Sequence, residues 1–259
     1  MVRNYIANHA ADADARYLLG LVLFRENKPA DSLAVYTQAA RLRKPVAENL
    51  RTVSLDYVLL NDYPDAERWI KYALSLDAND AEAWYQLGRI EYTLNRFQDS
   101  LSAFQRSLAL DPASVKAENN LGLAMEGLNR IDGAVAAYRK AIAMQADSTS
   151  PSEQPFLNLG KVLVDRSQLD EALPLLERAL AIAPHDWKIL EQLGRLKTEK
   201  GDLAAAARAF ELAIAIQPQS ASLHFQLGQV YRKSGEAEKA AREFALVQQL
   251  QGTHSTPER

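Results

Sequence analysis

Cysteine is absent from the 259-residue chain, which excludes disulfide bonds, thiolate metal sites and cysteine nucleophiles. Long apolar runs are missing as well, because none approaches the ~20 residues that a membrane-spanning helix needs. The opening residues, MVRNYIANHA, lack the apolar core of a signal peptide. We therefore expect no membrane insertion. The localisation stays unknown, since exported and cytosolic proteins can both lack cysteine.

An excess of charge of either sign is also lacking, because the formal net charge is only −3. Nothing in this balance indicates attraction to nucleic acid. The four histidines, His9, His185, His224 and His254, show no metal-ligand spacing, and no candidate nucleophile has a recognisable base partner. We therefore predict no catalytic residues, no metal and no cofactor, and we do not expect an enzyme.

What the chain does contain is a dipeptide, Leu-Gly, that recurs at a nearly constant interval. The steps are 34 residues, apart from one of 38, and the repeated position is occupied by Leu19, Val53, Leu87, Leu121, Leu159, Leu193 and Leu227. A small residue follows 13 places after each, and a large apolar residue 4 places further on. A fixed period of this length indicates internal repeats. Apolar spacings of three and four within each half-unit predict two amphipathic helices per repeat.

The ends of these helices are marked in the same register. Between the two helices of each unit stands a residue type that tolerates the left-handed conformation in which helices often end, namely Asn27, Asn61, Asn95, Asn129, Ser167, Gly201 or Gly235. Six of the seven first helices are preceded by a side chain that can cap their free amide groups: Asp12, Asp80, Ser114, Ser152, Asp186 and Ser220. Val46 interrupts that series. Each repeat is therefore predicted to be a helical hairpin.

The segment AWYQLGRIEYTLNRFQDSLSAFQRSLALDP (83–112) resembles the tetratricopeptide repeat (TPR), whose signature is W-x2-L-G-x2-Y, then A-x3-F, then P. The tryptophan, leucine, glycine, phenylalanine and proline match, whereas Glu91 and Ser100 replace the tyrosine and the alanine. The resemblance covers seven units, at 13–46, 47–80, 81–114, 115–148, 153–186, 187–220 and 221–252. It implies an all-α fold, an α-α superhelix of antiparallel helix pairs. The glycines then serve close helix packing, since no phosphate-loop motif is present.

The boundaries of this solenoid are predicted as follows. Residues 1–12 fit the second helix of a preceding repeat, so we expect the natural protein to begin earlier; a genuine short N-terminal helix is the alternative. Residues 13–252 form the seven repeats, with a four-residue insertion, TSPS, at 149–152. Residues 253–259 are polar and are expected to form a disordered tail.

In the tetratricopeptide family the face of the first helices opposite the core lines the concave surface, where ligands bind. At about 100° per residue, the position just before each leucine points to that face. Five consecutive repeats carry an amide there: Gln86, Asn120, Asn158, Gln192 and Gln226. Such an amide ladder can hydrogen-bond the backbone of an extended peptide. The alternative, amides without a bound backbone, stays open.

Two further sets of side chains fall on or beside the same face. The first is apolar and consists of Tyr17, Leu21, Phe24, Leu55, Tyr85 and Tyr92; these residues either form pockets or pack under a missing N-terminal unit. The second could contact a carboxylate or another anion and consists of Arg51, Arg89, Lys116, Lys161 and Arg195. The first three partly resemble the carboxylate clamp of chaperone-tail-binding family members, and solvated charges are the alternative.

These features predict a non-catalytic scaffold that binds an extended or helical peptide segment of a partner protein in its concave groove. A substrate-presenting or targeting region of a larger enzyme, for example a glycosyltransferase, is the alternative. Self-association through uncapped ends is a third possibility, because repeat solenoids usually need a terminal helix with a polar outer face.

Overall fold

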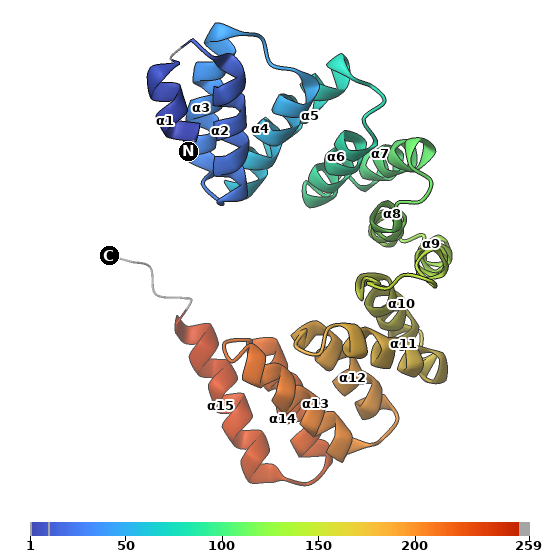
Figure 1. Ribbon diagram of the computed structural model, residues 1–259. Helices are drawn as coiled ribbons and strands as arrows, with labels where there is room; N and C mark the ends of the chain where they lie inside the picture. The colour runs from blue at the N-terminus through green and yellow to red at the C-terminus, as the bar shows by residue number, and fades with distance from the viewer. Residues whose placement is uncertain (1, 10, 254–259) are drawn as a thin grey trace. The chain divides into compact units, whose positions relative to one another are not determined.

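The computed structural model describes residues 2–9 and 11–253, and this part of the chain consists of fifteen α-helices without a strand (Figure 1). In chain order they are α1 (Val2–Asn8), α2 (Ala13–Arg25), α3 (Pro29–Leu42), α4 (Ala47–Leu59), α5 (Tyr63–Leu76), α6 (Ala81–Thr93), α7 (Phe97–Leu110), α8 (Val115–Gly127), α9 (Ile131–Met144), α10 (Gln154–Asp165), α11 (Leu169–Ile182), α12 (Trp187–Glu199), α13 (Leu203–Ile216), α14 (Ala221–Lys233) and α15 (Ala237–Thr253). The prediction of an all-α chain is confirmed.

From α2 onward the helices form seven consecutive pairs, one for each predicted repeat. An even-numbered helix, here called a first helix, packs against the odd-numbered second helix that follows it, and α3, α5, α7, α11 and α13 also pack against the first helix of the next pair. In the pair α8 and α9, Gly133 of the second helix lies against the Met125 sulfur of the first. This stacking of hairpins is the architecture of a helical solenoid.

The contacts divide the chain into two compact units, residues 1–137 and residues 138–259, which we call the N-terminal and C-terminal units and describe separately. The division falls inside α9, whereas the insertion 149–152 lies within the C-terminal unit. There, the buried side chain of Gln145 accepts a hydrogen bond from the backbone N–H of Ser152 at 2.8 Å and donates one to its carbonyl at 2.9 Å. This side chain therefore closes the loop that carries the four extra residues.

The predicted helix ends agree with the backbone conformation at every repeat. All seven residues between the paired helices have positive φ, from 55° at Ser167 to 82° at Gly235. The expected N-caps also form at five positions, where Asp12, Asp80, Ser114, Asp186 and Ser220 accept a hydrogen bond from a backbone N–H of the first turn.

One predicted cap is displaced by a residue. Helix α10 begins at Gln154, and its N-cap residue, Glu153, makes no capping hydrogen bond with its own side chain. Ser152 lies one residue too early because its backbone is held by Gln145, although its Oγ accepts a hydrogen bond from the Gln154 N–H at 3.3 Å. At the other exception, Val46, the Asn49 side chain accepts a hydrogen bond from the Val46 N–H at 3.1 Å.

The recurrent glycines allow close packing within five of the hairpins, as predicted. A Cβ added at Gly88 would lie 2.7 Å from the Phe104 ring, and one at Gly194 would lie 2.7 Å from the Phe210 ring. Gly20, Gly160 and Gly228 lie equally close to Tyr36, Leu176 and Phe244. Since real Cβ contacts are not this short, the close approach of the two helices requires glycine at these positions.

Serine hydroxyls close several hairpins on the buried side. Ser100, which replaces the alanine of the signature, donates to the Gly88 carbonyl at 2.8 Å. In the second hairpin, Ser54 stands at the glycine position and donates in the opposite direction, to the Ala66 carbonyl at 2.7 Å. The core lies between the helices of each pair and the next, and the three tryptophans, Trp69, Trp84 and Trp187, pack at its edge.

The ends of the chain are described only in part. Helix α1, which lies in the segment expected to belong to a preceding repeat, packs against α2. Helix α15 continues to Thr253, the first residue of the expected tail, and residues 254–259 lie outside the described part. None of the described helices is both long and apolar enough to cross a membrane.

Candidate functional site

The first helices of the N-terminal unit carry two neighbouring pockets on one face. The Gln86 pocket has a volume of about 70 Å³ and is lined by α4, α6 and the start of α5, through Leu55, Val58, Tyr63, Gln86, Arg89, Ile90 and Thr93. The Asn120 pocket has a volume of about 260 Å³ and is lined by α6, α7 and α8, through Arg89, Tyr92, Thr93, Phe104, Asn120 and Leu123. Arg89 and Thr93 line both pockets, so we treat them as one candidate site, the first-helix face.

Two amides of the predicted ladder belong to this face. Gln86 is only 6% exposed, and its side-chain oxygen is buried without a hydrogen-bond partner among the described residues. Asn120 is half-buried, donates to the Tyr85 hydroxyl at 3.1 Å and accepts from the Asn119 side chain at 3.1 Å. The acceptor of Gln86 is thus available to a donor that enters its pocket, whereas Asn120 is oriented by its neighbours.

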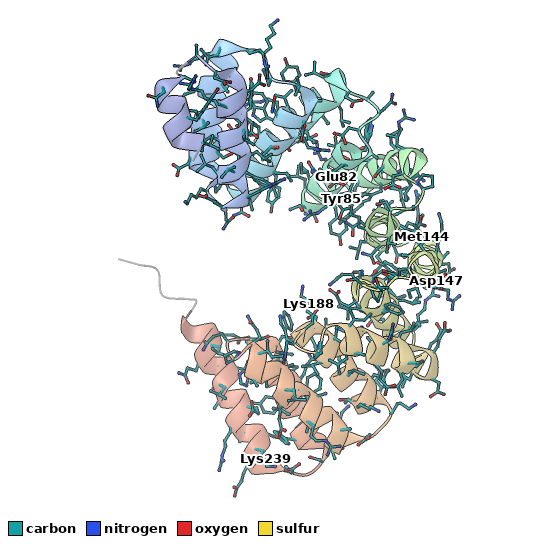
Figure 2. The ribbon with its side chains drawn as sticks, in the orientation of Figure 1. Glu82, Tyr85, Met144, Asp147, Lys188 and Lys239 are labelled. Carbon is teal, nitrogen blue, oxygen red and sulfur yellow. The ribbon has the colours of Figure 1, made fainter. Side chains whose placement is uncertain are left out.

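Tyr85 is the centre of a small group of cations and rings on the same face. The Lys116 Nζ lies 4.6 Å from the Tyr85 ring centroid and the Arg89 guanidinium carbon lies 5.9 Å from it, within the range of cation–π attraction. The Phe104 ring packs against Tyr85 with centroids 5.9 Å apart. Figure 2 labels Tyr85 and Glu82 on α6.

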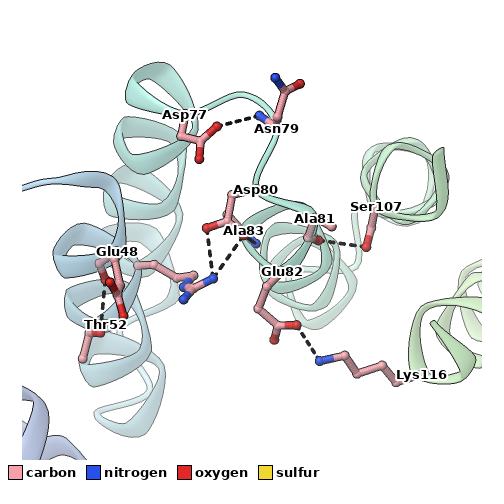
Figure 3. Close-up of polar contacts among 11 residues, drawn as sticks. Glu48, Thr52, Asp77, Asn79, Asp80, Ala81, Glu82, Ala83, Ser107 and Lys116 are labelled. Atoms are coloured by element: carbon pink, nitrogen blue, oxygen red, sulfur yellow. Dashed lines mark hydrogen bonds and ion pairs between the residues drawn. The ribbon is translucent and has the colours of Figure 1, made fainter. Parts of the chain in front are cut away.

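In the N-terminal unit, two of the predicted anion-binding cations already have carboxylate partners. Lys116 pairs with Glu82 at 2.5 Å (Figure 3), and Arg51 contacts both oxygens of Asp80 at 3.0 and 3.1 Å. Because Asp80 also caps α6 through the Ala83 N–H at 3.0 Å, the Arg51 ion pair joins two successive hairpins. Arg51 is therefore not free to bind the carboxylate of a ligand, as a carboxylate clamp would require.

Arg89 differs from these two cations. It is exposed, lies beside Tyr85, and has no carboxylate partner within the described residues. Its guanidinium is therefore available to an incoming carboxylate, which it can bind through two parallel hydrogen bonds.

The other three ladder amides lie in the C-terminal unit, and two of them are engaged there. Gln192 is 8% exposed and accepts from Arg195 at 2.9 Å, while Arg195 also pairs with Asp165 at 2.7 Å. Gln226 donates to Glu191 at 2.6 Å. Asn158 and Lys161 are half-buried on α10. Gln192 and Gln226 are therefore bound to side chains of the chain itself.

The predicted apolar residues also do not all line the same pocket. Leu55 lines the Gln86 pocket, and Tyr92 lines the Asn120 pocket, where it packs edge-on against Phe97 with centroids 5.4 Å apart. Leu21 and Phe24 are half-buried on α2 and line neither pocket.

Tyr17 was wrongly expected to belong to the groove. It is 5% exposed, and its hydroxyl donates to the Arg43 carbonyl at 2.6 Å. It lines a different space, the Tyr17 cavity of about 430 Å³, between α2, α3, α4 and α5. The hydrogen bond to the end of α3 draws the ring into the core, an interaction that helical spacing does not reveal.

Sequence reasoning missed two buried carboxyl groups in the N-terminal unit. Asp56 is fully buried and accepts a hydrogen bond from Ser32 at 2.6 Å, and burial raises its pKa to about 7. Glu91 is 5% exposed, and burial raises its pKa to about 7 as well. The departure of Glu91 from the signature tyrosine was the signal that could have found it.

The arrangement is suited to binding. Among the described residues no group of three or more histidine, aspartate or glutamate side chains could hold a metal ion. The first-helix face instead offers apolar pockets, one open acceptor and one open guanidinium, which together can hold a polypeptide segment.

Comparison with known proteins agrees with this architecture. A family model described as "Tetratricopeptide repeat" matches residues 1–46, 54–115, 85–151, 157–221 and 192–252. A search of curated proteins found no match.

Several solved structures are similar. PilW, described as a widely conserved type IV pilus biogenesis factor, is 25% identical with a TM-score of 0.72 over 82% of this chain and 95% of its own. PilF from Pseudomonas aeruginosa is 15% identical with a TM-score of 0.72 over 88% and 99%. YrrB, described as a TPR protein with an unusual peptide-binding site, is 23% identical with a TM-score of 0.55 over 71% and 93%. The likenesses to PilF and YrrB concern the fold.

Proposed function

Because the chain belongs to the tetratricopeptide repeat family, we propose that it is a non-catalytic scaffold that binds an extended segment of a partner protein on the first-helix face of the N-terminal unit. The family and its fold are typical of protein–protein interaction scaffolds. The observation that carries the proposal is Arg89, an exposed guanidinium that lines both pockets and has no carboxylate partner among the described residues.

The chemistry of the two pockets indicates the kind of segment that fits. Leu55, Val58 and Ile90 give the smaller pocket an apolar wall, and Tyr92, Phe104 and Leu123 do the same for the larger one. Arg89 lies at both. We infer a segment in which an acidic residue stands between two apolar residues, with its carboxylate on Arg89 and its apolar neighbours in the pockets.

Gln86 supplies a backbone contact in this proposal. Its buried oxygen has no hydrogen-bond partner in the described part of the chain, and an unsatisfied buried acceptor costs about 1–3 kcal/mol. A backbone N–H of the bound segment would satisfy it. In this unit two amides of the predicted ladder, Gln86 and Asn120, take part in binding. Asn120 holds the Tyr85 hydroxyl in position through its hydrogen bond and does not bind the peptide alone.

Selection from a displayed library of random peptides on the immobilised chain tests the proposal. We expect the selected peptides to carry an acidic residue between apolar ones. Measured by fluorescence anisotropy with synthetic copies, Arg89→Ala should weaken their binding about tenfold, the value of one charge-assisted contact.

The matched control is Arg178→Ala, which removes an exposed arginine from α11 of the C-terminal unit and should leave the affinity unchanged. The proposal fails if selection yields no peptides, or if the selected peptides bind Arg89→Ala as tightly as the unmodified chain.

A further inference from the structure

A second cavity of the N-terminal unit is separate from the first-helix face. It has a volume of about 710 Å³, lies between α5, α6 and α7, and is lined by Lys71, Leu74, Ser75, Trp84, Leu87, Glu91, Asp99, Ser102, Ala103 and Arg106. We call it the Glu91 cavity. None of these residues lines the Gln86 or the Asn120 pocket.

The size of the Glu91 cavity follows from two substitutions relative to the preceding repeat. The corresponding space one repeat earlier, the Tyr17 cavity, contains Tyr57 and Trp69. Counting 34 residues on from these two gives Glu91 and Ala103. A carboxyl and a methyl group thus stand where the earlier repeat has two aromatic rings, which leaves more room and makes the bottom of the cavity acidic.

Glu91 has no partner that would explain its burial. It is 5% exposed, and its Oε2 atom is buried without a hydrogen-bond partner among the described residues. A buried acceptor of this kind is normally satisfied by a donor or an ion. Glu91 is also part of the cavity lining, so its carboxyl group lies next to a space that can hold a donor.

The charged side chains around Glu91 give its Oε2 atom no hydrogen bond among the described residues. From α5, Glu67 lies 2.5 Å from Lys71 Nζ and also 2.5 Å from Arg96 Nη2, so both cations are shared with that carboxylate. Helix α7 contributes Asp99 and Arg106 to the cavity wall. Lys71 and Arg106 balance Glu91 and Asp99 in formal charge along the cavity wall, so the feature that favours a cation is the unpaired Glu91 oxygen and not a net negative charge.

We propose that the Glu91 cavity binds the guanidinium or ammonium group of an arginine or lysine side chain of a partner protein. Leu74, Leu87 and Ala103 are buried walls suited to the alkyl stem, and the indole of Trp84 offers a face for the cation. Ser75 and Ser102 provide acceptors at the rim for the remaining N–H groups. A divalent metal is a poor occupant, because no three ligands gather in the described residues.

The binding should depend on pH. Burial is the largest cause of the raised pKa of Glu91, about 7; Lys71 and Arg96 oppose the rise, while Asp99 and Glu67 add to it. At lower pH the carboxyl is neutral and loses its attraction for a cation. Binding should therefore tighten as the pH rises through about 7.

The probe for this site is N-acetyl-arginine methylamide, compared with the uncharged N-acetyl-norleucine methylamide. Binding is followed through the indole N–H resonance of Trp84, which is assigned with Trp84→Phe. We expect saturable shifts with the arginine probe. Glu91→Gln should weaken the binding of the arginine probe about tenfold or more, because a charge-assisted contact is lost. The matched control is Glu177→Gln, on α11, which should leave the binding of this probe unchanged.

The stability of the variants does not limit the test. Glu91→Gln removes a buried charge, and Glu91→Tyr restores the signature residue and fills the cavity; circular dichroism should show both folded, and both should bind the probe weakly. Equal affinity for the arginine and norleucine probes, unchanged affinity of Glu91→Gln, or no Trp84 shift would overturn the proposal. Binding of putrescine about tenfold tighter than the arginine probe would assign the cavity to a free diamine instead.

Discussion

Asp56 should make the stability of the N-terminal unit fall as the pH rises. Its carboxyl is fully buried, and burial raises its pKa from 3.8 to about 7. The native state therefore holds a proton that the unfolded chain releases between these two values. For a group with a raised native pKa, the stabilisation is complete below the unfolded value and is lost as the pH rises through the native one.

The size of the effect follows from the two pKa values. Between about pH 5.5 and about pH 8, the free energy of unfolding should drop by about 2 kcal/mol on account of Asp56. Glu91, with its pKa raised to about 7 in the same unit, should add a comparable drop. Asp56→Asn keeps an acceptor for Ser32 and cannot ionise, so it should retain about half of the pH dependence.

Urea unfolding, followed by circular dichroism at several pH values, measures how the free energy of unfolding depends on pH. Relative to the unmodified chain, Asp56→Asn should gain about 2 kcal/mol in going from about pH 5.5 to about pH 8. Asp31→Asn, at an exposed position of α3, is the control and should follow the unmodified chain. A variant Asp56→Asn with the unaltered pH slope would refute the reasoning, since the buried carboxyl would then not be the titrating group.

Three further predictions concern the repeat architecture. Gly194→Ala should destabilise by about 1–3 kcal/mol in urea unfolding, because its Cβ would lie 2.7 Å from the Phe210 ring; an unchanged midpoint would contradict the close-packing role. Asn95 has a φ of 58°, so Asn95→Ala should cost about 1 kcal/mol while Asn95→Gly should not, as thermal melting will reveal. Asp80→Ala removes both the α6 cap and the partner of Arg51 and should cost about 1–2 kcal/mol, whereas Asp80→Asn, which retains a capping oxygen, should cost less; equal losses would mean that the cap contributes little.

The fold could be predicted because its determinants are local and periodic. The residue types that end helices, such as Asn27 and Gly201, act through their own backbone conformation, and the glycine at Gly88 acts on Phe104 at a fixed distance along the chain. The failure at Ser152 occurred where the period is interrupted, because the backbone there is held by a long-range contact with Gln145.

The site was harder to predict, because its chemistry depends on which side chains of successive repeats are paired. Arg51 was expected to be free, yet it binds Asp80, 29 residues later; Lys116 binds Glu82, 34 residues earlier. Spacing alone does not mark an occupied cation, because Glu118 also stands 29 residues after Arg89 and yet no carboxylate pairs with Arg89 among the described residues. Arg89 was among the predicted residues, whereas the cavity at Glu91 depends on the volume of neighbouring side chains.

The hairpins repeat not only their packing but also the residues at their junctions. Asp80 caps α6 and Ser114 caps α8, each through the N–H of an alanine three residues later. Excision of residues 81–114 would place Asp80 in front of Val115, where it could take over the cap of α8 with no new junction sequence. During gene evolution, such a chain can gain or lose whole repeats. The length that it offers to a partner can therefore be selected independently of the side chains in any one hairpin.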